Sequence, residues 1–311
     1  MIQLINLTKK YADKTAVNNI SFQIHPGVVT GFLGPNGAGK STTIRMILNL
    51  AIPTAGNVTV DGKVFANLSN PLKKIGAMVD ANAIDSRLTP KQYLRILTTA
   101  SGLAKEKAEE VLSLVGLKEV ENKKIGKFSF GMRQRVGLAA VLIGDPETLI
   151  LDEPFNGLDV DGIHWLRTSL RDLAKQGKAI LISSHLLSEV QEVADRIIML
   201  AKGELIADMS MEELQEKSLS SYVQVQTDDA LKLSEILKTE GAQVDLTREK
   251  ILRVRKMSQK HIGDIAFGHE LRIYELVTHH PSLEQLFAEM IEGKTEYRGS
   301  NLSSEKEEAA Q

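Results

Sequence analysis

The sequence contains no cysteine, which excludes disulfide bonds and cysteine-ligated zinc sites. It has no excess of basic residues: the formal net charge is −2, so no global positive field would draw the chain to nucleic acid. Long apolar runs are also missing, since VGLAAVLIG (136–144) is about half of the ~18 residues that a membrane span needs. The N-terminus lacks the pattern of a signal peptide. We therefore expect a soluble chain, for which any membrane role requires a partner.

The sequence does contain enough apolar material, 42% of 311 residues, for one large or two modest domains. Short β-rich runs alternate with helical runs, which predicts α/β organisation. The runs at 28–34, 148–154 and 178–185 are typical of buried strands. Residues 90–127, rich in Leu, Ala, Lys and Glu, are typical of a mostly helical insert.

We predict three segments along the chain. An α/β domain covers residues 1–215, with the helical insert at about 85–140. A capping-box pattern that begins at Ser210 predicts a helix near the domain boundary. Alternating strand and helix patterns (βαβαβα) predict a small accessory α+β domain over 216–295. Residues 296–311 are polar and charged, and we expect them to form a disordered tail.

The segment GPNGAGKST (34–42) matches the phosphate-binding pattern G-x-x-x-x-G-K-[ST] between a predicted strand and a predicted helix. Its glycines let successive backbone N–H groups point at phosphate, and the helix N-terminus adds positive charge. We expect Lys40 to reach the β- and γ-phosphates and Ser41 to hold Mg²⁺. A glycine-rich turn without a ligand is the alternative, and a chance match in this context is rare. The predicted nucleotide-binding residues are Gly34, Pro35, Asn36, Gly37, Ala38, Gly39, Lys40, Ser41 and Thr42.

Two adjacent acids, Asp152 and Glu153, end the predicted strand of LILDEP. If this strand lies beside the strand of the phosphate loop, Asp152 would bind Mg²⁺ and Glu153 would be the base that polarises the attacking water. The alternative is that Glu153 only caps the following turn. His185 ends a third predicted strand, and parallel strands deliver their carboxyl ends to one ligand-binding edge. We therefore predict that His185 contacts the γ-phosphate, the alternative being a purely structural histidine.

The motifs GPNGAGKST, FSFGMRQR, LILDEP, NGLD and SSH occur in an order and spacing that resembles the ATP-binding subunit of ABC transporters, over about residues 1–210. The resemblance implies a P-loop NTPase core with a parallel sheet, an N-terminal antiparallel β element, the cofactors ATP and Mg²⁺, and ATP hydrolysis. In such proteins two ATPase domains face head to tail, and each ATP lies between the phosphate loop of one and the signature turn of the other. This implies a homodimer, or a heterodimer with a second ATPase subunit, that drives separate integral-membrane permease subunits.

Further site residues follow from the resemblance. Ser129 and Gly131, in the signature turn, are implied to contact the γ-phosphate that the partner subunit binds. Asp159 is implied to lie at the subunit boundary and to link the two sites. Tyr11 matches the aromatic residue that stacks on adenine, an ordinary half-buried core tyrosine being the alternative.

Two positions depart from the family pattern. The signature is Phe-Ser-Phe-Gly-Met instead of Leu-Ser-Gly-Gly-Gln, so Phe130 and Met132 stand where the family has glycine and glutamine. Asp80 stands where the family has another glutamine; its carboxylate could ligate Mg²⁺ or hold the attacking water, and a solvated loop aspartate is the alternative. Both departures resemble the branch of bacitracin-resistance and lantibiotic-immunity exporters.

We therefore expect an ATP-hydrolysing subunit at the cytoplasmic face of the membrane, attached through the permease, that exports a peptide antibiotic, drug or similar amphipathic compound. No nucleic acid is expected as a partner. Two alternatives are an ATPase of the same family that acts on DNA or ribosomes, and a P-loop kinase. The first usually has long coiled-coil insertions or two ATPase heads, and the second leaves FSFGMRQR and SSH without a role.

Overall fold

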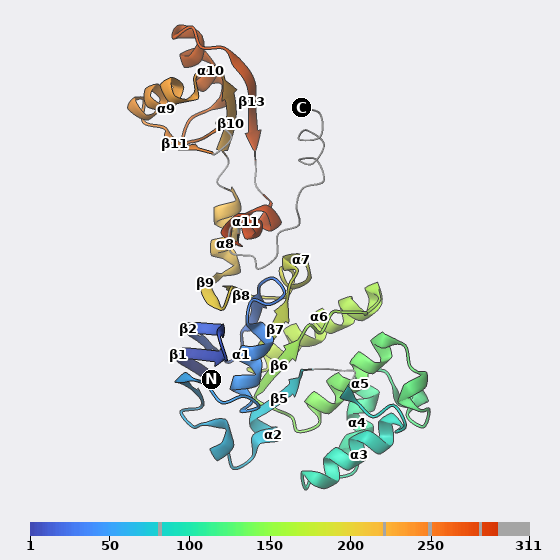
Figure 1. The fold of residues 1–311 in the computed structure, drawn as a ribbon. Helices are drawn as coiled ribbons and strands as arrows, with labels where there is room; N and C mark the ends of the chain where they lie inside the picture. Colours follow the sequence, from blue (N-terminus) through green and yellow to red (C-terminus); the bar gives the residue numbers. More distant parts are fainter. Residues whose placement is uncertain (80–82, 220–221, 248–250, 280–281, 292–311) are drawn as a thin grey trace, which may run out of the picture. The chain divides into compact units, whose positions relative to one another are not determined.

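The computed structural model describes residues 1–79, 83–219, 222–247, 251–279 and 282–291 (Figure 1). The chain divides into two compact units, Met1–Met211 and Glu212–Met290. The predicted tail at 296–311 lies outside the described residues. In the part of the chain that the structure covers, no helix combines the length and the apolar character that a membrane crossing requires.

The first unit is built on a six-stranded sheet in the order β5-β6-β7-β3-β8-β9. The bounds are β3 Val29–Leu33, β5 Ile75–Met78, β6 Thr148–Asp152, β7 Ala179–Ser184, β8 Arg196–Ala201 and β9 Glu204–Ser210. Neighbouring strands are parallel from β5 to β8, and β9 is antiparallel to β8. Every residue of β3 and β7 is buried, as expected for parallel strands that are covered on both faces. Because β6, β7 and β3 are adjacent and parallel, the segments that follow them leave the sheet at one edge.

A second sheet, antiparallel and in the order β2-β1-β4, forms the N-terminal element. Its strands are β1 Ile2–Tyr11, β2 Lys14–Ile24 and β4 Ala55–Val60. Side chains from both sheets share one apolar core, in which the Phe22 and Phe32 rings have centroids 5.5 Å apart. The predicted fold class, a P-loop type α/β core with an N-terminal antiparallel β element, is confirmed.

The region between β5 and β6 is mostly helical, and its helices pack on one another (Figure 1). Thr89 begins α3 with a capping box: its hydroxyl accepts from Gln92 N at 3.2 Å, and Gln92 Oε1 accepts from Thr89 N at 3.0 Å. The helices of this region are α3 Pro90–Ala100, α4 Lys107–Leu114 and α5 Phe130–Leu142, with the 3₁₀ turns η3 Lys118–Val120 and η4 Ile125–Lys127. The remaining helices of the first unit are α1 Lys40–Ile47, η1 Phe65–Asn67, α2 Pro71–Lys74, α6 Val160–Lys175 and α7 Leu187–Val190.

The second unit has an antiparallel sheet in the order β11-β12-β10-β13, with α9 and α10 packed on it. The bounds are α8 Met211–Leu219, β10 Tyr222–Thr227, α9 Ala230–Thr239, β11 Gln243–Leu246, β12 Leu252–Arg255, α10 Gln259–Gly268, β13 Ile273–His279 and α11 Leu283–Ile291. Helix α8 begins directly after Ser210, as the capping box predicts. The predicted βαβαβα order lacked β11, an edge strand of only four residues in which the alternation of polar and apolar residues (Gln-Val-Asp-Leu) is very short.

Candidate nucleotide-binding site

The phosphate loop connects the end of β3 to the start of α1, as the sequence predicts. Gly39 caps α1 with φ 106°, and a Cβ at this position would lie 2.6 Å from Ala16 O. Glycine is therefore needed both for the backbone conformation and for the close approach of β2. Thr43 Oγ1 donates to Gly39 O at 2.9 Å and closes the first turn. This loop presents backbone N–H groups and a helix N-terminus to one pocket, which suits an anion.

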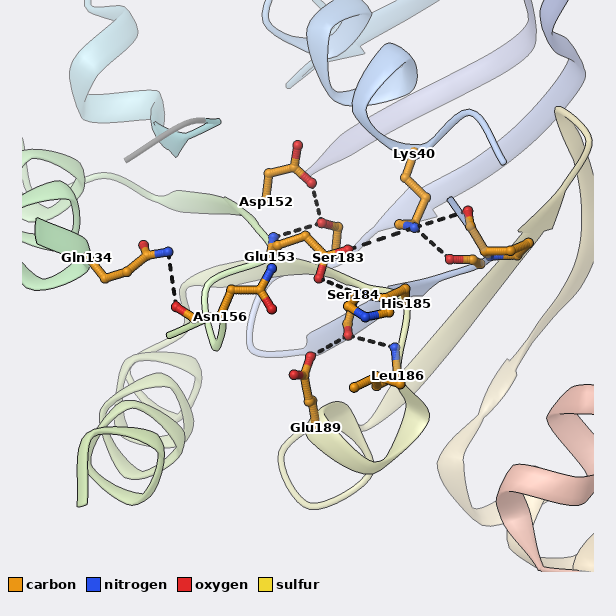
Figure 2. Close-up of polar contacts among 12 residues, drawn as sticks. Lys40, Gln134, Asp152, Glu153, Asn156, Ser183, Ser184, His185, Leu186 and Glu189 are labelled. Atoms are coloured by element: carbon orange, nitrogen blue, oxygen red, sulfur yellow. Dashed lines mark hydrogen bonds and ion pairs between the residues drawn. The ribbon is translucent and has the colours of Figure 1, made fainter. Parts of the chain in front are cut away.

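Lys40 is folded over this loop and is only 6% exposed. Its Nζ donates to Gly34 O at 2.6 Å and to Pro35 O at 3.4 Å, and it lies 3.9 Å from Glu153 Oε1 (Figure 2). Burial lowers the pKa of Lys40, and it outweighs the opposite effect of the nearby Glu153 and Asp152 carboxylates. The lysine is thus a buried charge that lies between its own loop and the acid pair.

The acid pair lies at the end of β6, where Asp152 is in register with Ser183 of β7. The Ser183 hydroxyl donates to Asp152 Oδ1 and accepts from Glu153 N, the latter at 3.0 Å (Figure 2). Glu153 has φ 48°, in the left-handed region, so its backbone turns away from the strand direction immediately after Asp152. Ser183 therefore holds both acids. Sequence reasoning missed this residue, although the parallel pairing of LILD with LISS would have placed it opposite Asp152.

His185 follows β7 and contacts the second acid. Its Nδ1 lies 3.0 Å from Glu153 Oε2 (Figure 2). The turn that carries His185 is fixed by Ser184, whose hydroxyl donates to Glu189 Oε2 at 2.5 Å and accepts from Leu186 N at 2.9 Å. Lys40, Glu153 and His185 thus form one connected group, although they come from three separate parts of the sequence.

A pocket of about 400 Å³ lies over the phosphate loop. Tyr11 is 48% exposed and lies at the wall of this pocket. The Lys9 ammonium lies 4.8 Å from the centroid of the Tyr11 ring. The predicted site residue Asp80 lies outside the described residues. The pocket is lined by Tyr11, Lys14, Ala16, Pro35, Asn36, Gly37, Ala38, Gly39, Lys40, Ser41, Thr42 and Glu153.

The signature turn has a pocket of its own, of about 320 Å³. Ser129 caps α5 by accepting from Met132 N at 3.2 Å, and Asp159 caps α6 by accepting from Gly162 N at 2.8 Å. The residues that line this pocket are Ser129, Phe130, Gly131, Met132, Arg135, Gly157, Leu158 and Asp159. None of them lines the pocket over the phosphate loop. These two pockets are therefore separate.

The donor set fits Mg²⁺ together with a nucleotide. No group of three His, Cys, Asp or Glu side chains that could hold a metal ion occurs within the described ranges. Mg²⁺ in nucleotide sites usually takes only one or two carboxylates, with phosphate oxygens and water completing its shell. Ser41, at the start of α1, and Asp152, at the end of β6, offer such hard oxygen ligands.

Known proteins share both the sequence and the fold. The family described as "ABC transporter" matches residues 17–156, and a "Domain of unknown function (DUF8746)" matches residues 221–284. The chain is 34% identical over 302 residues to the bacitracin transport ATP-binding protein BcrA of Bacillus licheniformis, covering 95% of this chain and 98% of that protein. It is 36% identical over 208 residues to the lantibiotic transport ATP-binding protein SrtF of Streptococcus pyogenes, covering 67% of this chain and 90% of that protein.

A solved structure shows the same fold. The dimeric post-hydrolysis state of the ATP-binding cassette MJ0796, bound to ADP and Pi, superposes with a TM-score of 0.62 at 26% identity, covering 68% of this chain and 99% of that chain. Lys40 of the phosphate loop and His185 both contact Glu153 of the acid pair. The chain belongs to the ATP-binding, ATP-hydrolysing subunits of ABC transporters, in the branch of the bacitracin and lantibiotic transport proteins.

Proposed function

We propose that two ATPase subunits close around two Mg-ATP and drive a separate permease at the cytoplasmic face of the membrane. In this proposal the second subunit is another copy of this chain. A heterodimer with a related ATPase chain is the alternative form of the same proposal. The observation that supports it is the separation of the two half-sites, since the pocket over the phosphate loop and the signature pocket share no lining residue. Each half-site becomes complete only when a second subunit supplies the other half.

The residues of the phosphate-loop half have distinct proposed roles. Tyr11 stacks on the adenine, and Lys40 binds the β- and γ-phosphates. Glu153 accepts the proton of the attacking water, and His185, which contacts Glu153 in the structure, orients the γ-phosphate and the water. Ser41 and Asp152 would hold Mg²⁺, which neutralises the charge on the phosphates.

The signature half acts on the nucleotide of the partner subunit. We propose that Ser129 and Gly131 contact its γ-phosphate and that Asp159 lies at the subunit boundary. Asp80 is proposed as a third oxygen ligand for Mg²⁺ or as a holder of the attacking water. If Asp80 is such a ligand, Asp80→Asn requires more Mg²⁺ for half-maximal hydrolysis.

The proposed cargo is an amphipathic peptide antibiotic or a similar drug, and the direction is export. The support is that a relative spanning 95% of this chain is named a bacitracin transport protein. The names of these two relatives refer to transport, which also favours this function over an ATPase that acts on DNA or ribosomes. Co-expression with a permease of this branch in a sensitive bacterium should raise the inhibitory concentration of bacitracin or of a lantibiotic. The same permease with Glu153→Gln should give no protection.

Dimerisation tests the proposal on the purified chain. Glu153→Gln binds ATP without hydrolysing it, so analytical ultracentrifugation should show a dimer with Mg-ATP and a monomer without nucleotide. Lys40→Ala in the same background is the control, because it removes the phosphate contact and should stay monomeric. A monomer of Glu153→Gln under both conditions would refute the homodimer.

A further inference from the structure

The ring of Phe130 packs directly on the backbone of Gly157. A Cβ at Gly157 would lie 2.0 Å from Phe130 Cδ1, closer than real Cβ contacts come. Gly157 also has φ 68°, which disfavours any side chain. Phe130 stands where the family signature has glycine, so this contact joins the signature turn to the loop of NGLD in this chain.

Two further contacts hold the same elements together. Gln134 Nε2 donates to Asn156 O at 3.4 Å, which ties the second turn of α5 to the loop. The Arg133 guanidinium lies 5.8 Å from the Phe130 centroid and donates to Phe128 O at 2.9 Å. The ring thus lies near both an arginine of its own helix and the backbone of the loop.

The loop itself is hydrogen-bonded to the backbone of the acid pair. Asn156 N donates to Glu153 O at 3.3 Å, and Leu158 N donates to Phe155 O at 3.2 Å. Phe155 is only 2% exposed, so the middle of the loop is anchored in the core. The signature turn and the backbone of Glu153 are therefore linked by a short chain of contacts.

We propose that Phe130 is a positioning residue that moves the signature turn and the Glu153–Asp159 loop as one body. When the signature turn closes on the nucleotide of the partner, Phe130 sets the Glu153 carboxylate in its own site. Hydrolysis at one site thereby depends on occupancy of the other. This inference rests on the proposed dimer.

The test compares Phe130→Ala and Phe130→Leu with Phe267→Ala, a matched control at a phenylalanine that is 87% exposed. A misplaced base lowers the rate of the chemical step, so Phe130→Ala should lose about 10- to 100-fold in kcat, while the ATP concentration at half-saturation stays within about twofold. If the two sites are coupled, the rate of the wild type should depend sigmoidally on ATP concentration, and Phe130→Ala should lose this sigmoidicity. Phe130→Leu keeps apolar δ-carbons against Gly157 and should retain more of the kcat, and Phe267→Ala should behave as the wild type.

Gly157→Ala, combined with Phe130→Ala, provides a second and independent test. If the ring and the glycine backbone are in functional contact, the added methyl should harm kcat more when Phe130 is present than in Phe130→Ala, where space has been made. Additive effects on kcat would overturn the inference, as would a wild-type kcat in Phe130→Ala. Loss of ATP-driven dimerisation in Glu153→Gln/Phe130→Ala would also overturn it, because Phe130 would then act in binding. If Glu153→Gln alone fails to dimerise, the proposed dimer fails instead.

Discussion

Replacing Ser183 by alanine should weaken both the fold and the catalytic site. The side chain is fully buried, and its hydroxyl donates to the Asp152 carboxylate while it accepts from Glu153 N. Without it the partly buried Glu153 N–H loses its hydrogen-bond partner, and Asp152 loses a charge-assisted hydrogen bond that water replaces only in part. We expect the free energy of unfolding to fall by about 2–4 kcal/mol. A base displaced by about 1 Å should reduce kcat by roughly 100-fold.

Ser184→Ala is the matched control for this prediction. Ser184 is equally buried in the same strand, but its hydroxyl bonds Glu189 and Leu186 N and contacts neither acid. Urea unfolding gives the stability of both variants, and Mg²⁺ titrations of ATP hydrolysis give the kcat and the half-saturating Mg²⁺ concentration. Ser183→Ala should need more Mg²⁺, because Asp152 is less well oriented. Because Ser184 fixes the turn that carries His185, the Mg²⁺ requirement is the readout that distinguishes the two variants. If both variants require the same Mg²⁺, Ser183 does not hold the acids as the structure indicates.

Three further predictions concern single groups of the site. Glu153→Gln should lower hydrolysis by about 10²–10⁴-fold, with fluorescent ATP analogues still bound, because the general base is lost; rapid hydrolysis would exclude Glu153 as the base. Tyr11→Ala should raise the Kd for ATP by roughly 5- to 150-fold through lost stacking, whereas Tyr11→Phe should bind normally; equal affinities would contradict the adenine contact. Burial lowers the pKa of Lys40 below 10.5, so between that lowered pKa and 10.5 the unfolded chain binds more protons. Urea unfolding without nucleotide should then show the stability of the wild type rising with pH relative to Lys40→Met, and parallel curves would contradict this.

The fold class and the position of the phosphate loop were predictable because their signals are local. A strand, a glycine-rich turn and a helix follow one another in GPNGAGKST and its flanks, and the buried strands are continuous apolar runs. The parallel arrangement then brings Asp152 and His185 to the edge that bears Lys40. The short edge strand β11 was missed, because its alternation of polar and apolar residues covers only four positions, too few to distinguish a strand from a loop.

The contacts that refine the site depend on tertiary structure. Ser183 serves Asp152 only because β6 and β7 are paired in one particular register. Phe130 meets Gly157 only because the start of α5 packs against a loop 27 residues further along the chain. In the sequence, Phe130 is visible only as a departure from the family signature and Gly157 only as a glycine of NGLD. Sequence patterns identify which residue types are present, whereas register and packing decide which of them touch.

The left-handed backbone of Glu153, with φ 48°, restricts what evolution can place at the base position. Such a conformation costs a residue with a Cβ about 1–2 kcal/mol, and β-branched residues tolerate it worst. Catalysis alone would require only a carboxylate at this position, but the left-handed backbone independently restricts which residue types are tolerated. A descendant of this chain that abandons hydrolysis and keeps the fold should therefore drift to Gly, Asn, Asp or Gln at this position. Val, Ile and Thr should remain absent even after the catalytic requirement has disappeared.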